Sequence, residues 1–382
     1  MLTLALASTA LTACGSHRDA AEAPKKPTAV SVSVSTSDCG SSWRPTAAGH
    51  QQLTLHNTDL RSGEILLTDA RTGAVFADVD PLASGASAAL AVDLGPGRYT
   101  LRCVMEDADV ITGTPVTLTG SADRVSPSVL PVSQNDLIRP TKQYEAYVLK
   151  RLPGLRTLTT TLAKDITDGH LDAARAAWLP AHVAYESLGA AYGAFGDDDA
   201  RINGLASGLP HGAADAGFTG FHRLEYGLWH GQSAAQLRAP AAELLAAVNA
   251  LTTRFASAQL APAEVSLRAH EIIENSVQFE LTGQTDYGSG TNLATVAANL
   301  AGTSTVLALL RPLLSTRYRA LATLDTAISQ ARKDVDAEQA AGHWTPLQQL
   351  SRARRERLNS DLSELSELLA PVAAICEPRR TS

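Results

Sequence analysis

Two different periods of hydrophobic residues divide the chain. From residue 29 to 120, apolar residues alternate with polar ones in short runs, and turn residues such as Asn57 and Gly95-Pro96-Gly97 separate the runs. A period of two is typical of half-buried β-strands. The expected strands are AVSVSVST, QQLTLHNT, EILLTDA, AVFADVD, SAALAVDL, GRYTLRCVM and TPVTLTG. Strands of this length and spacing predict an all-β antiparallel sandwich over residues 29–120.

From about residue 135 the period lengthens to that of an α-helix. Stretches rich in Ala and Leu repeat their apolar positions every three or four residues, and no strand-like alternation competes with them. The expected helices cover approximately 136–167, 171–195, 218–230, 233–258, 262–282, 290–313, 315–340 and 345–370. This pattern predicts an all-α bundle over residues 135–376. Residues 121–134, SADRVSPSVLPVSQ, carry two prolines and are expected to form a linker.

The first residues are typical of an exported protein. Residues 1–13, MLTLALASTALTA, carry no charge, are too short to span a bilayer, and match the apolar core of a secretory signal. The sequence Leu11-Thr12-Ala13-Cys14 resembles the lipobox of bacterial lipoproteins, in which the cysteine is lipidated. We therefore expect residues 1–28 to be a lipoprotein signal and tether, with Cys14 as the lipid anchor that holds the protein to the membrane in the cell envelope or periplasm.

Length and charge narrow the classes of function. A chain of 382 residues is longer than one core usually serves, so two domains are expected. The formal net charge of -7 argues against a nucleic-acid partner, which requires a basic face. The one dense basic run, Arg352 to Arg357, falls in a helical pattern and is expected to be a solvated helix face.

Three further cysteines lie beyond the signal: Cys39, Cys103 and Cys376. Outside the cytoplasm a pair of cysteines tends to oxidise. Because Cys39 and Cys103 flank one β-rich segment, they are either a disulfide or two metal ligands. A blue-copper centre needs two histidines and a cysteine, with one histidine shortly after the cysteine. No histidine follows Cys103 in the β-rich half, which argues against such a centre. Cys376 has no assigned role.

In the helical half, two histidine–glutamate pairs have the spacing of one helix face. His222 and Glu225 are three residues apart in GFTGFHRLEYGLWHG, and His182 and Glu186 are four apart in WLPAHVAYE. Residues at these spacings lie on the same face of a helix. Imidazole and carboxylate groups suit iron, zinc or manganese, but two ligands alone do not make a metal site.

A third pair has a simpler interpretation. His270 and Glu274, in HEIIE, repeat the four-residue spacing. The segment is not the HExxH motif of zinc proteases, because its last residue is a glutamate. We expect an exposed pair on an amphipathic helix.

Four segments together resemble a known family. They are WLPAHVAYE, FGDDDARIN, FTGFHRLEYGLW and NLATVAANLAGTSTVLALLRPLL, in this order along residues 135–370. They resemble the imelysin-like (M75) domain and, more closely, the EfeO/EfeM-type iron-uptake lipoproteins. The third segment is the most specific, since it carries the HxxE signature. The β-rich half, with its two cysteines and the strand PGRYTLRC, is similar to the cupredoxin-like domain that precedes the M75 domain in these lipoproteins.

The resemblance implies a metal site in the helical half. His222 and Glu225 correspond to two of its ligands, and Glu186 corresponds to a third. The family pattern has further acidic residues where this chain has Gly189 and Asn203. A later acidic stretch is here Gln284-Thr285-Asp286, which leaves only Asp286.

The loss of these carboxylates changes the metal that we expect. A site for Fe³⁺ built from oxygen anions would be weakened, and His182 could add a nitrogen donor. This shifts the expected preference from Fe³⁺ toward Fe²⁺, Zn²⁺ or Cu²⁺. In the β-rich half, the resemblance implies a second metal site at Cys39, Glu64, Cys103 and Met105, for which the Cys39–Cys103 disulfide is the alternative.

The resemblance also implies the function. It describes an extracytoplasmic lipoprotein that captures iron, or another transition metal, and passes it to a membrane permease, with a haem-peroxidase in the same uptake system and no catalytic turnover. One alternative is a binding or scaffold lipoprotein whose metal site has decayed. Another is an M75-type metallopeptidase, which needs three protein ligands, a bound water and a general base. Without HExxH, the sequence favours metal capture over hydrolysis.

Overall fold

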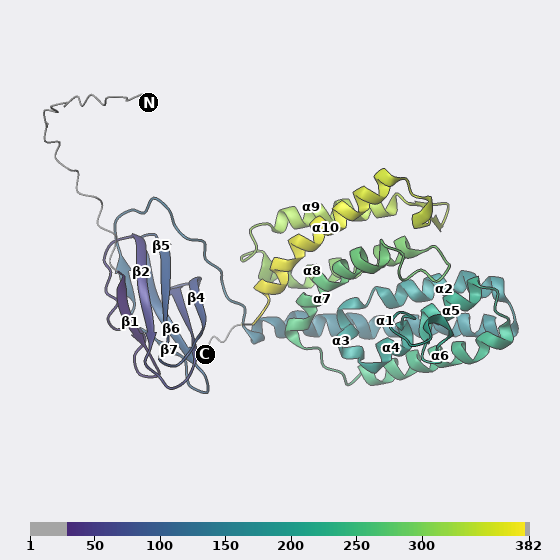
Figure 1. Cartoon of the computed structure of the whole chain (residues 1–382), viewed down its shortest axis with the longest axis horizontal. Coiled ribbons are helices and arrows are strands. Elements are labelled where there is room, and N and C mark those ends of the chain that lie inside the picture. Colours follow the sequence, from purple (N-terminus) through teal and green to yellow (C-terminus); the bar gives the residue numbers. More distant parts are fainter. Residues whose placement is uncertain (1–28, 379–382) are drawn as a thin grey trace, which may run out of the picture. The chain divides into compact units, whose positions relative to one another are not determined.

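The computed structural model describes residues 29–378. Cys14 and the predicted signal and tether lie outside the described residues. The chain divides into two compact units, one built mainly of strands and the other mainly of helices (Figure 1).

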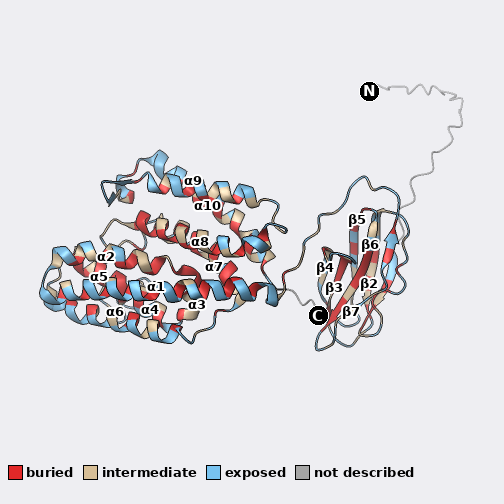
Figure 2. Ribbon diagram, turned by 180° about the vertical axis from the view of Figure 1, so that it is seen from behind, coloured by how far each residue is buried: buried red, intermediate tan, exposed pale blue. Residues whose placement is uncertain are grey.

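The β-rich unit contains all the expected strands and one short addition. They are β1 (Val30–Val34), β2 (Gly49–Asn57), β3 (Gly63–Asp69), β4 (Val75–Leu82), β5 (Ser87–Leu94), β6 (Gly97–Met105), β7 (Ile111–Thr112) and β8 (Val116–Leu118). One sheet has the order β1-β2-β5 and the other has the order β4-β3-β6-β7, with β8 also paired to β6. The strands carry their buried residues, red in Figure 2, toward a common core that includes Val32, Leu53, Ile65, Leu90 and Leu101.

One edge of this unit departs from the expected antiparallel pattern. β1 pairs with β2 in parallel, with Val30 opposite Leu53, whereas β2 and β5 are antiparallel. A parallel pair needs a crossover of a dozen or more residues, and residues 35–48 supply it. The alternation of apolar residues predicts a strand but carries no information on its direction, so the expectation of a wholly antiparallel sandwich was wrong here.

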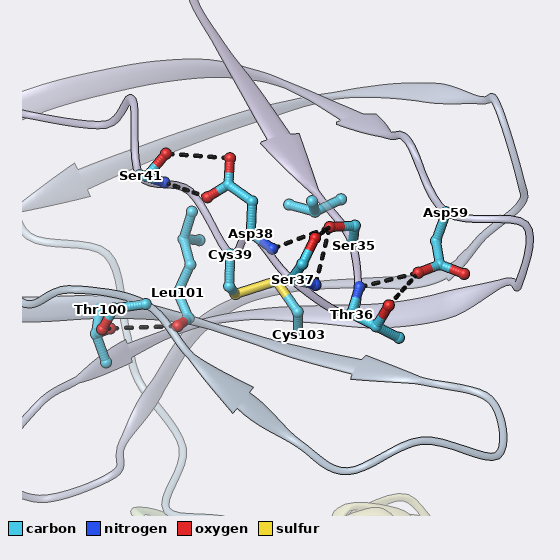
Figure 3. The surroundings of a disulfide bond; sticks show 12 residues. Ser35, Thr36, Ser37, Asp38, Cys39, Ser41, Asp59, Thr100, Leu101 and Cys103 are labelled. Atoms are coloured by element: carbon cyan, nitrogen blue, oxygen red, sulfur yellow. Dashed lines mark hydrogen bonds between the residues drawn. A yellow bond between two sulfur atoms is a disulfide. The ribbon is translucent and has the colours of Figure 1, made fainter.

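The two cysteines of the β-rich unit form a disulfide (Figure 3). Cys39 follows β1, Cys103 lies in β6, their Cα atoms are 5.8 Å apart, and both side chains are buried. Their sulfurs are therefore not available as thiolate ligands. Of the two alternatives at this position, the structure contains the disulfide and not the metal site that would also use Glu64 and Met105. The loop before Cys39 is held by Ser35, whose Oγ accepts from the backbone N–H groups of Ser37 and Asp38.

The helical unit begins at the end of the predicted linker. Ser133 caps the first helix and forms a reciprocal capping box with Asp136. The helices are α1 (Gln134–Asp168), α2 (Leu171–Glu186), α3 (Tyr192–Phe195), α4 (Asp197–Asn203), α5 (Gly220–Trp229), α6 (Ala234–Phe255), α7 (Pro262–Asn275), α8 (Asn292–Leu314), α9 (Leu321–Asp336) and α10 (Arg352–Ile375). Short 3₁₀ turns lie at Gly189–Ala191, Gly212–Ala214 and Leu347–Gln349. A helix is present in each of the expected ranges, but the helices begin and end at residues other than those predicted.

The stretch predicted as one helix over 171–195 is broken in the structure. α2 ends at Glu186, and a 3₁₀ turn leads into α3. A Cβ atom on Gly302 of α8 would lie 2.9 Å from the carbonyl oxygen of Ser187, so α8 packs closely against the chain where α2 ends. α4 forms between the helices expected over 171–195 and 218–230, where no helix was predicted, and its first turn carries three aspartates, which the helix dipole favours. A small hairpin, β9 (Gln339–Ala340) and β10 (His343–Trp344), also forms where no strand was expected.

A wider turn follows α7. Residues Ser276–Glu280 form a π-helix that continues directly from Asn275. Such turns are rare and are frequently found at functional sites. The π-helix ends at Glu280, whose carboxylate accepts a hydrogen bond from Asn292 in the first turn of α8.

α8 is the most apolar helix of the unit. Of the described helices it is the one that is long and apolar enough to cross a membrane, with 23 residues and a mean hydropathy of 1.6. However, 67% of that window is buried inside the protein. A helix in the core of a protein is also apolar on all its faces. Because α8 is mostly buried, it is a core helix of this unit.

Candidate metal-binding pocket

The polar side chains of the helical core gather around two neighbouring cavities. The larger has a volume of about 240 Å³ and the smaller about 10 Å³. We call them the large cavity and the small cavity. His222, Glu280 and Thr285 line both. The large cavity is also lined by Glu186, Gly189, Asp199, Asn203 and Arg268, and the small cavity by His182, Glu225, Asp286, Ser289 and Asn292.

The first pair, His222 and Glu225, lies on the buried face of α5. The helix starts at Gly220, which has φ 82°, and a Cβ atom there would collide with the carbonyl oxygen of Ile202 at the end of α4. Only glycine therefore lets α5 begin so close to α4. The Nδ1 atom of His222 lies 3.2 Å from Oε2 of Glu225, and both side chains are almost completely buried.

The loop before α8 completes the surroundings of Glu225. Its Oε1 atom accepts from the backbone N–H groups of Tyr287 and Ser289, both at 3.1 Å, and from the Ser289 hydroxyl at 2.6 Å. Burial raises the pKa of Glu225, but the hydrogen bond and charge of His222 and the hydroxyl of Ser289 outweigh it, so the pKa is lowered. Glu225 is therefore an ionised carboxylate with hydrogen bonds at both of its oxygens.

The second pair, His182 and Glu186, lies on α2. The Nε2 atom of His182 lies 3.1 Å from Oε1 of Glu186 and 3.2 Å from Oδ1 of Asn203. The Asn203 amide donates to the same Glu186 oxygen at 2.7 Å. Burial lowers the pKa of His182, but the hydrogen bond and charge of Glu186 outweigh it, so the pKa is raised. Burial by itself raises the pKa of Glu186, but the hydrogen bond and charge of His182 outweigh burial, so the pKa of Glu186 is lowered.

The two pairs meet through their imidazole rings. The ring centroids of His182 and His222 are 5.1 Å apart, and Trp178 stacks on His182 at 4.7 Å. The predicted residues Glu186 and His222 line the large cavity together, while Glu225 faces the small cavity. The structure thus brings His182, Glu186, His222 and Glu225 into one polar core.

Two other candidates from the sequence have different roles. Asp286 lines the small cavity, but its Oδ1 atom accepts from the N–H groups of Gly288 at 2.9 Å and Gly290 at 3.0 Å, so it holds the loop. His270 and Glu274 line neither cavity, and their side chains are 19% and 57% exposed. His270 instead contacts Ser366 of α10 at 3.3 Å.

Sequence reasoning missed two acidic residues of the pocket. Glu280 is buried, and burial together with the charge of Glu186 raises its pKa. Asp199 of α4 accepts a hydrogen bond from Tyr185, and burial raises the pKa of Asp199. Glu280 lies shortly before Gln284-Thr285-Asp286, the stretch where acidic residues were expected, and Asp199 lies in the FGDDDARIN segment that carried the resemblance. Only the π-helix and the unpredicted helix α4 turn these carboxylates toward the cavity.

Gly189 and Asn203, the two positions where an acidic residue was expected from the resemblance, also lie at the pocket. Gly189 lines the large cavity, and a Cβ atom there would lie 2.8 Å from the Cδ1 atom of Ile272. Ile272 therefore occupies the space that a longer side chain at 189 would need. Asn203 bridges His182 and Glu186, so a neutral amide stands where the family pattern has a carboxylate.

Within residues 29–378, no group of three or more His, Cys, Asp or Glu side chains is arranged to hold a metal ion. His182 is instead paired with Glu186 and His222 with Glu225, while Glu280 accepts from Asn292. The residue types suit a transition metal, because imidazole and carboxylate are the ligands that Fe²⁺ and Zn²⁺ accept.

Comparison with known proteins identifies the family. The family model of imelysin, Peptidase_M75, matches residues 140–372. The chain belongs to the imelysin family. It is also 25% identical over 374 residues to the iron uptake system component EfeO of Escherichia coli K12, covering 97% of this chain and 96% of that protein. The EfeO of Yersinia pestis is 25% identical over 354 residues, which cover 91% of this chain and 90% of that protein.

These similarities confirm the resemblance to EfeO-type iron uptake components. The match extends over nearly the whole chain, so it includes the β-rich unit as well as the imelysin domain. It supports a role in an iron uptake system.

Proposed function

We propose that this chain is the extracytoplasmic metal-binding component of an iron uptake system. In this proposal Cys14 anchors the protein to the membrane, the β-rich unit is cupredoxin-like, and the helical unit captures iron or another transition metal. The ion then passes to a membrane permease, with a haem-peroxidase acting in the same system. The protein itself performs no chemical turnover.

One observation carries the proposal. Two buried imidazole–carboxylate pairs, His182–Glu186 and His222–Glu225, meet beside a cavity of about 240 Å³. Burying ionised carboxylates is costly unless they are paired, and buried groups with shifted pKa values beside a cavity mark a candidate functional site. A cavity that combines them with Glu280 and Asp199 attracts cations. The similarity to EfeO over almost the whole chain makes iron the first cation to test.

A scaffold protein with a decayed metal site is the second candidate. The arrangement of the pocket favours it. Asn203 places a neutral amide where a fully acidic pocket would have an oxygen ligand, and Ile272 fills the space that a longer side chain at residue 189 would need. The two candidates differ in one measurable property, because only a working site retains metal through purification.

The test is the metal content of the full chain, purified in detergent without chelators, together with growth of iron-starved cells that lack the chromosomal copy. The wild-type chain should carry about one ion per chain and restore growth. The double variant His222→Ala/Glu186→Gln should do neither. The matched control, His270→Ala/Glu274→Gln, removes a pair of the same residue types from α7 and should behave as wild type.

The outcomes separate the candidates. A wild-type chain that binds no added Fe²⁺ but still restores growth would support the scaffold and overturn metal capture. Cleavage of casein by the wild-type chain, lost in the double variant, would support the peptidase alternative.

A further inference from the structure

A third cavity of the helical unit lies at the start of α10 and takes no part in the candidate metal-binding pocket. Its volume is about 260 Å³, and none of its lining residues lines the large or the small cavity. Three segments form it: the residue that follows the π-helix, the 3₁₀ turn before α10, and the first two turns of α10. Because four leucines line it, we call it the leucine cavity.

The interior of the leucine cavity is apolar. Leu347, Leu350 and Leu358 are 7%, 5% and 2% exposed, and Leu281 is half-buried beside them. Leucine side chains offer water no hydrogen bonds, and a dry apolar cavity of about 150 Å³ is large enough to bind benzene. On the same scale the leucine cavity has room for about ten non-hydrogen atoms. It therefore fits an apolar group rather than a cluster of waters.

The mouth of the cavity carries one unpaired positive charge. Arg355 and Glu356 both line the cavity and are exposed. The carboxylate of Glu356 is already paired, because Nε of Arg352 donates to its Oε1 atom at 2.6 Å. Within the described residues, no ion pair or side-chain hydrogen bond involves the guanidinium of Arg355. An arginine in this state can bind a carboxylate through two parallel hydrogen bonds.

The other arginines of the run at Arg352–Arg357 have partners in the chain. Nη1 of Arg354 lies 2.8 Å from Oε1 of Glu338, and the charge of Arg357 acts on Asp334 of α9. The run was expected to be a solvated helix face, and its residues are exposed. Of its four arginines, only Arg355 combines a free guanidinium with a place at the cavity.

The surface around the cavity does not favour a broad protein interface. The large apolar side chains that stay exposed in the described part of the chain include none from residues 276–378. A stable protein interface buries more than about 1,000 Å² and has an apolar centre. The leucine cavity offers a single apolar space with charged residues at its mouth, which fits one small amphiphilic molecule.

We propose that the leucine cavity binds one medium-chain fatty acid. The alkyl tail lies among the four leucines, and the carboxylate pairs with Arg355. A chain of about eight carbons matches the volume, because octanoate has about ten non-hydrogen atoms. A membrane surface is a poorer match, since anionic lipids attract clusters of unpaired basic residues and this run has one. The site is independent of the proposed function.

The experiment is a calorimetric titration with sodium octanoate as the probe. The full chain carries Cys14→Ser, so that it can be studied without a lipid anchor or detergent. We expect one site with a dissociation constant on the order of 0.1 mM. Each methylene added between hexanoate and octanoate should tighten binding by about fourfold. Dodecanoate should gain nothing further, because its tail outgrows the cavity.

Variants at the mouth test the role of the charge. Arg355→Ala should weaken octanoate binding by about tenfold or more, the expected loss for a charge-assisted hydrogen bond. Arg355→Glu should lose octanoate and bind octylammonium instead. The matched control is Arg319→Ala, which removes an exposed arginine that does not line the cavity and should keep the wild-type affinity. Both residues are exposed, and circular dichroism establishes that the variants are folded.

Several results would overturn the site. They are octanoate that does not bind, equal octanoate affinity in the wild type and Arg355→Ala, and octylammonium that binds the wild type as tightly as octanoate. Binding of a peptide that ends in leucine, with no heat from octanoate, would overturn the fatty acid and make the cavity a peptide site. None of these results changes the iron that the chain retains, so failure here is distinct from failure of the proposed function.

Discussion

The helix pairs on α2 and α7 have the same sequence spacing and different surroundings. His182–Glu186 and His270–Glu274 are both four residues apart. The first pair is in contact at 3.1 Å with side chains only 2% and 8% exposed, and the second is at 3.7 Å with 19% and 57% exposed. Spacing places two side chains on one helix face, but packing decides what they do. An exposed pair contributes little, whereas a buried pair shifts its own pKa values and needs partners at every polar atom.

The burial of the α2 pair has specific causes. Trp178 stacks on His182 from the preceding turn, and the Trp178 indole donates to the carbonyl oxygen of Phe221 at 2.8 Å. This contact ties α2 to α5 and sets the two histidine rings against each other. On α7, by contrast, the Nε2 atom of His270 lies 3.3 Å from a serine hydroxyl of α10, and Glu274 stays largely exposed.

The largest difference between the pairs should be in metal affinity. His222→Ala removes a ligand nitrogen from the pocket and should weaken Zn²⁺ binding by at least about 100-fold. His270→Ala, at the exposed pair, should change the dissociation constant by less than about twofold. Calorimetric titration of the full chain with Zn²⁺ measures both. Equal losses in the two variants would mean that binding does not depend on the buried pocket.

The charge of the pocket provides a gain-of-function test. Asn203→Asp places a second carboxylate beside Glu186, at a position where the amide nitrogen now lies 2.7 Å from the Glu186 oxygen. Two carboxylates this close repel each other unless they share a proton or a cation lies between them. Fe³⁺ affinity should rise by about tenfold or more, and Zn²⁺ affinity should rise less, because the attraction scales with the charge of the ion.

Restoring an acid at residue 189 needs a second change. Gly189→Glu alone should gain nothing, since Ile272 occupies the space, while Gly189→Glu/Ile272→Ala should add to the Fe³⁺ gain. Calorimetry with Fe³⁺ delivered as a weak chelate compares the variants. Equal gains for Fe³⁺ and Zn²⁺ would show that neither position faces the ion.

The stability of the metal-free protein should depend on pH through the α2 pair. The pKa of His182 is raised above its ordinary 6.5, so its contribution to the free energy of unfolding is present below pH 6.5 and is lost as the pH rises through the folded value. The pKa of Glu186 is lowered below its ordinary 4.5, so its contribution is present above pH 4.5 and is lost as the pH falls through the folded value.

Between pH 4.5 and pH 6.5 both contributions are present. The difference in Tm between the wild type and His182→Gln should therefore be largest in this window, as measured by thermal denaturation with a chelator present. His270→Gln should show no comparable window. A difference that is constant with pH would contradict the assigned charges of the pair.

The smallest effect on metal binding is expected from the β-rich unit. The Cys39–Cys103 disulfide closes a sequence separation of 64 residues, and its removal should cost this unit about 4 kcal/mol of unfolding free energy on the chain-entropy account. Metal affinity in Cys39→Ser/Cys103→Ser should stay unchanged below the melting temperature of the unit. Loss of metal from this variant would instead support a metal site in the β-rich unit.

The sequence predicted much of the fold because the two hydrophobic periods are clear in each half. It did not predict the parallel pairing of β1, since strand direction depends on the crossover and not on alternation. It also missed α4 and the π-helix, whose turns depend on packing against α5 and α8. For the same reason it missed Asp199 and Glu280, although both stand in or beside segments that were singled out.

At the site, residue types and spacing led to His182, Glu186, His222 and Glu225, which lie together. The division of roles among them could not be predicted. Whether a carboxylate faces an ion or an imidazole depends on hydrogen bonds from distant segments, such as those from Tyr287 and Ser289 to Glu225.

The most direct test of the central claim is anaerobic equilibrium dialysis of the full chain against ⁵⁵Fe²⁺. The wild type and the α7 variant His270→Ala/Glu274→Gln should each retain about one ion per chain, and His182→Ala/His222→Ala should retain none. If the two double variants retain the same amount of iron, or if the wild type retains none, the buried pocket is not the iron site.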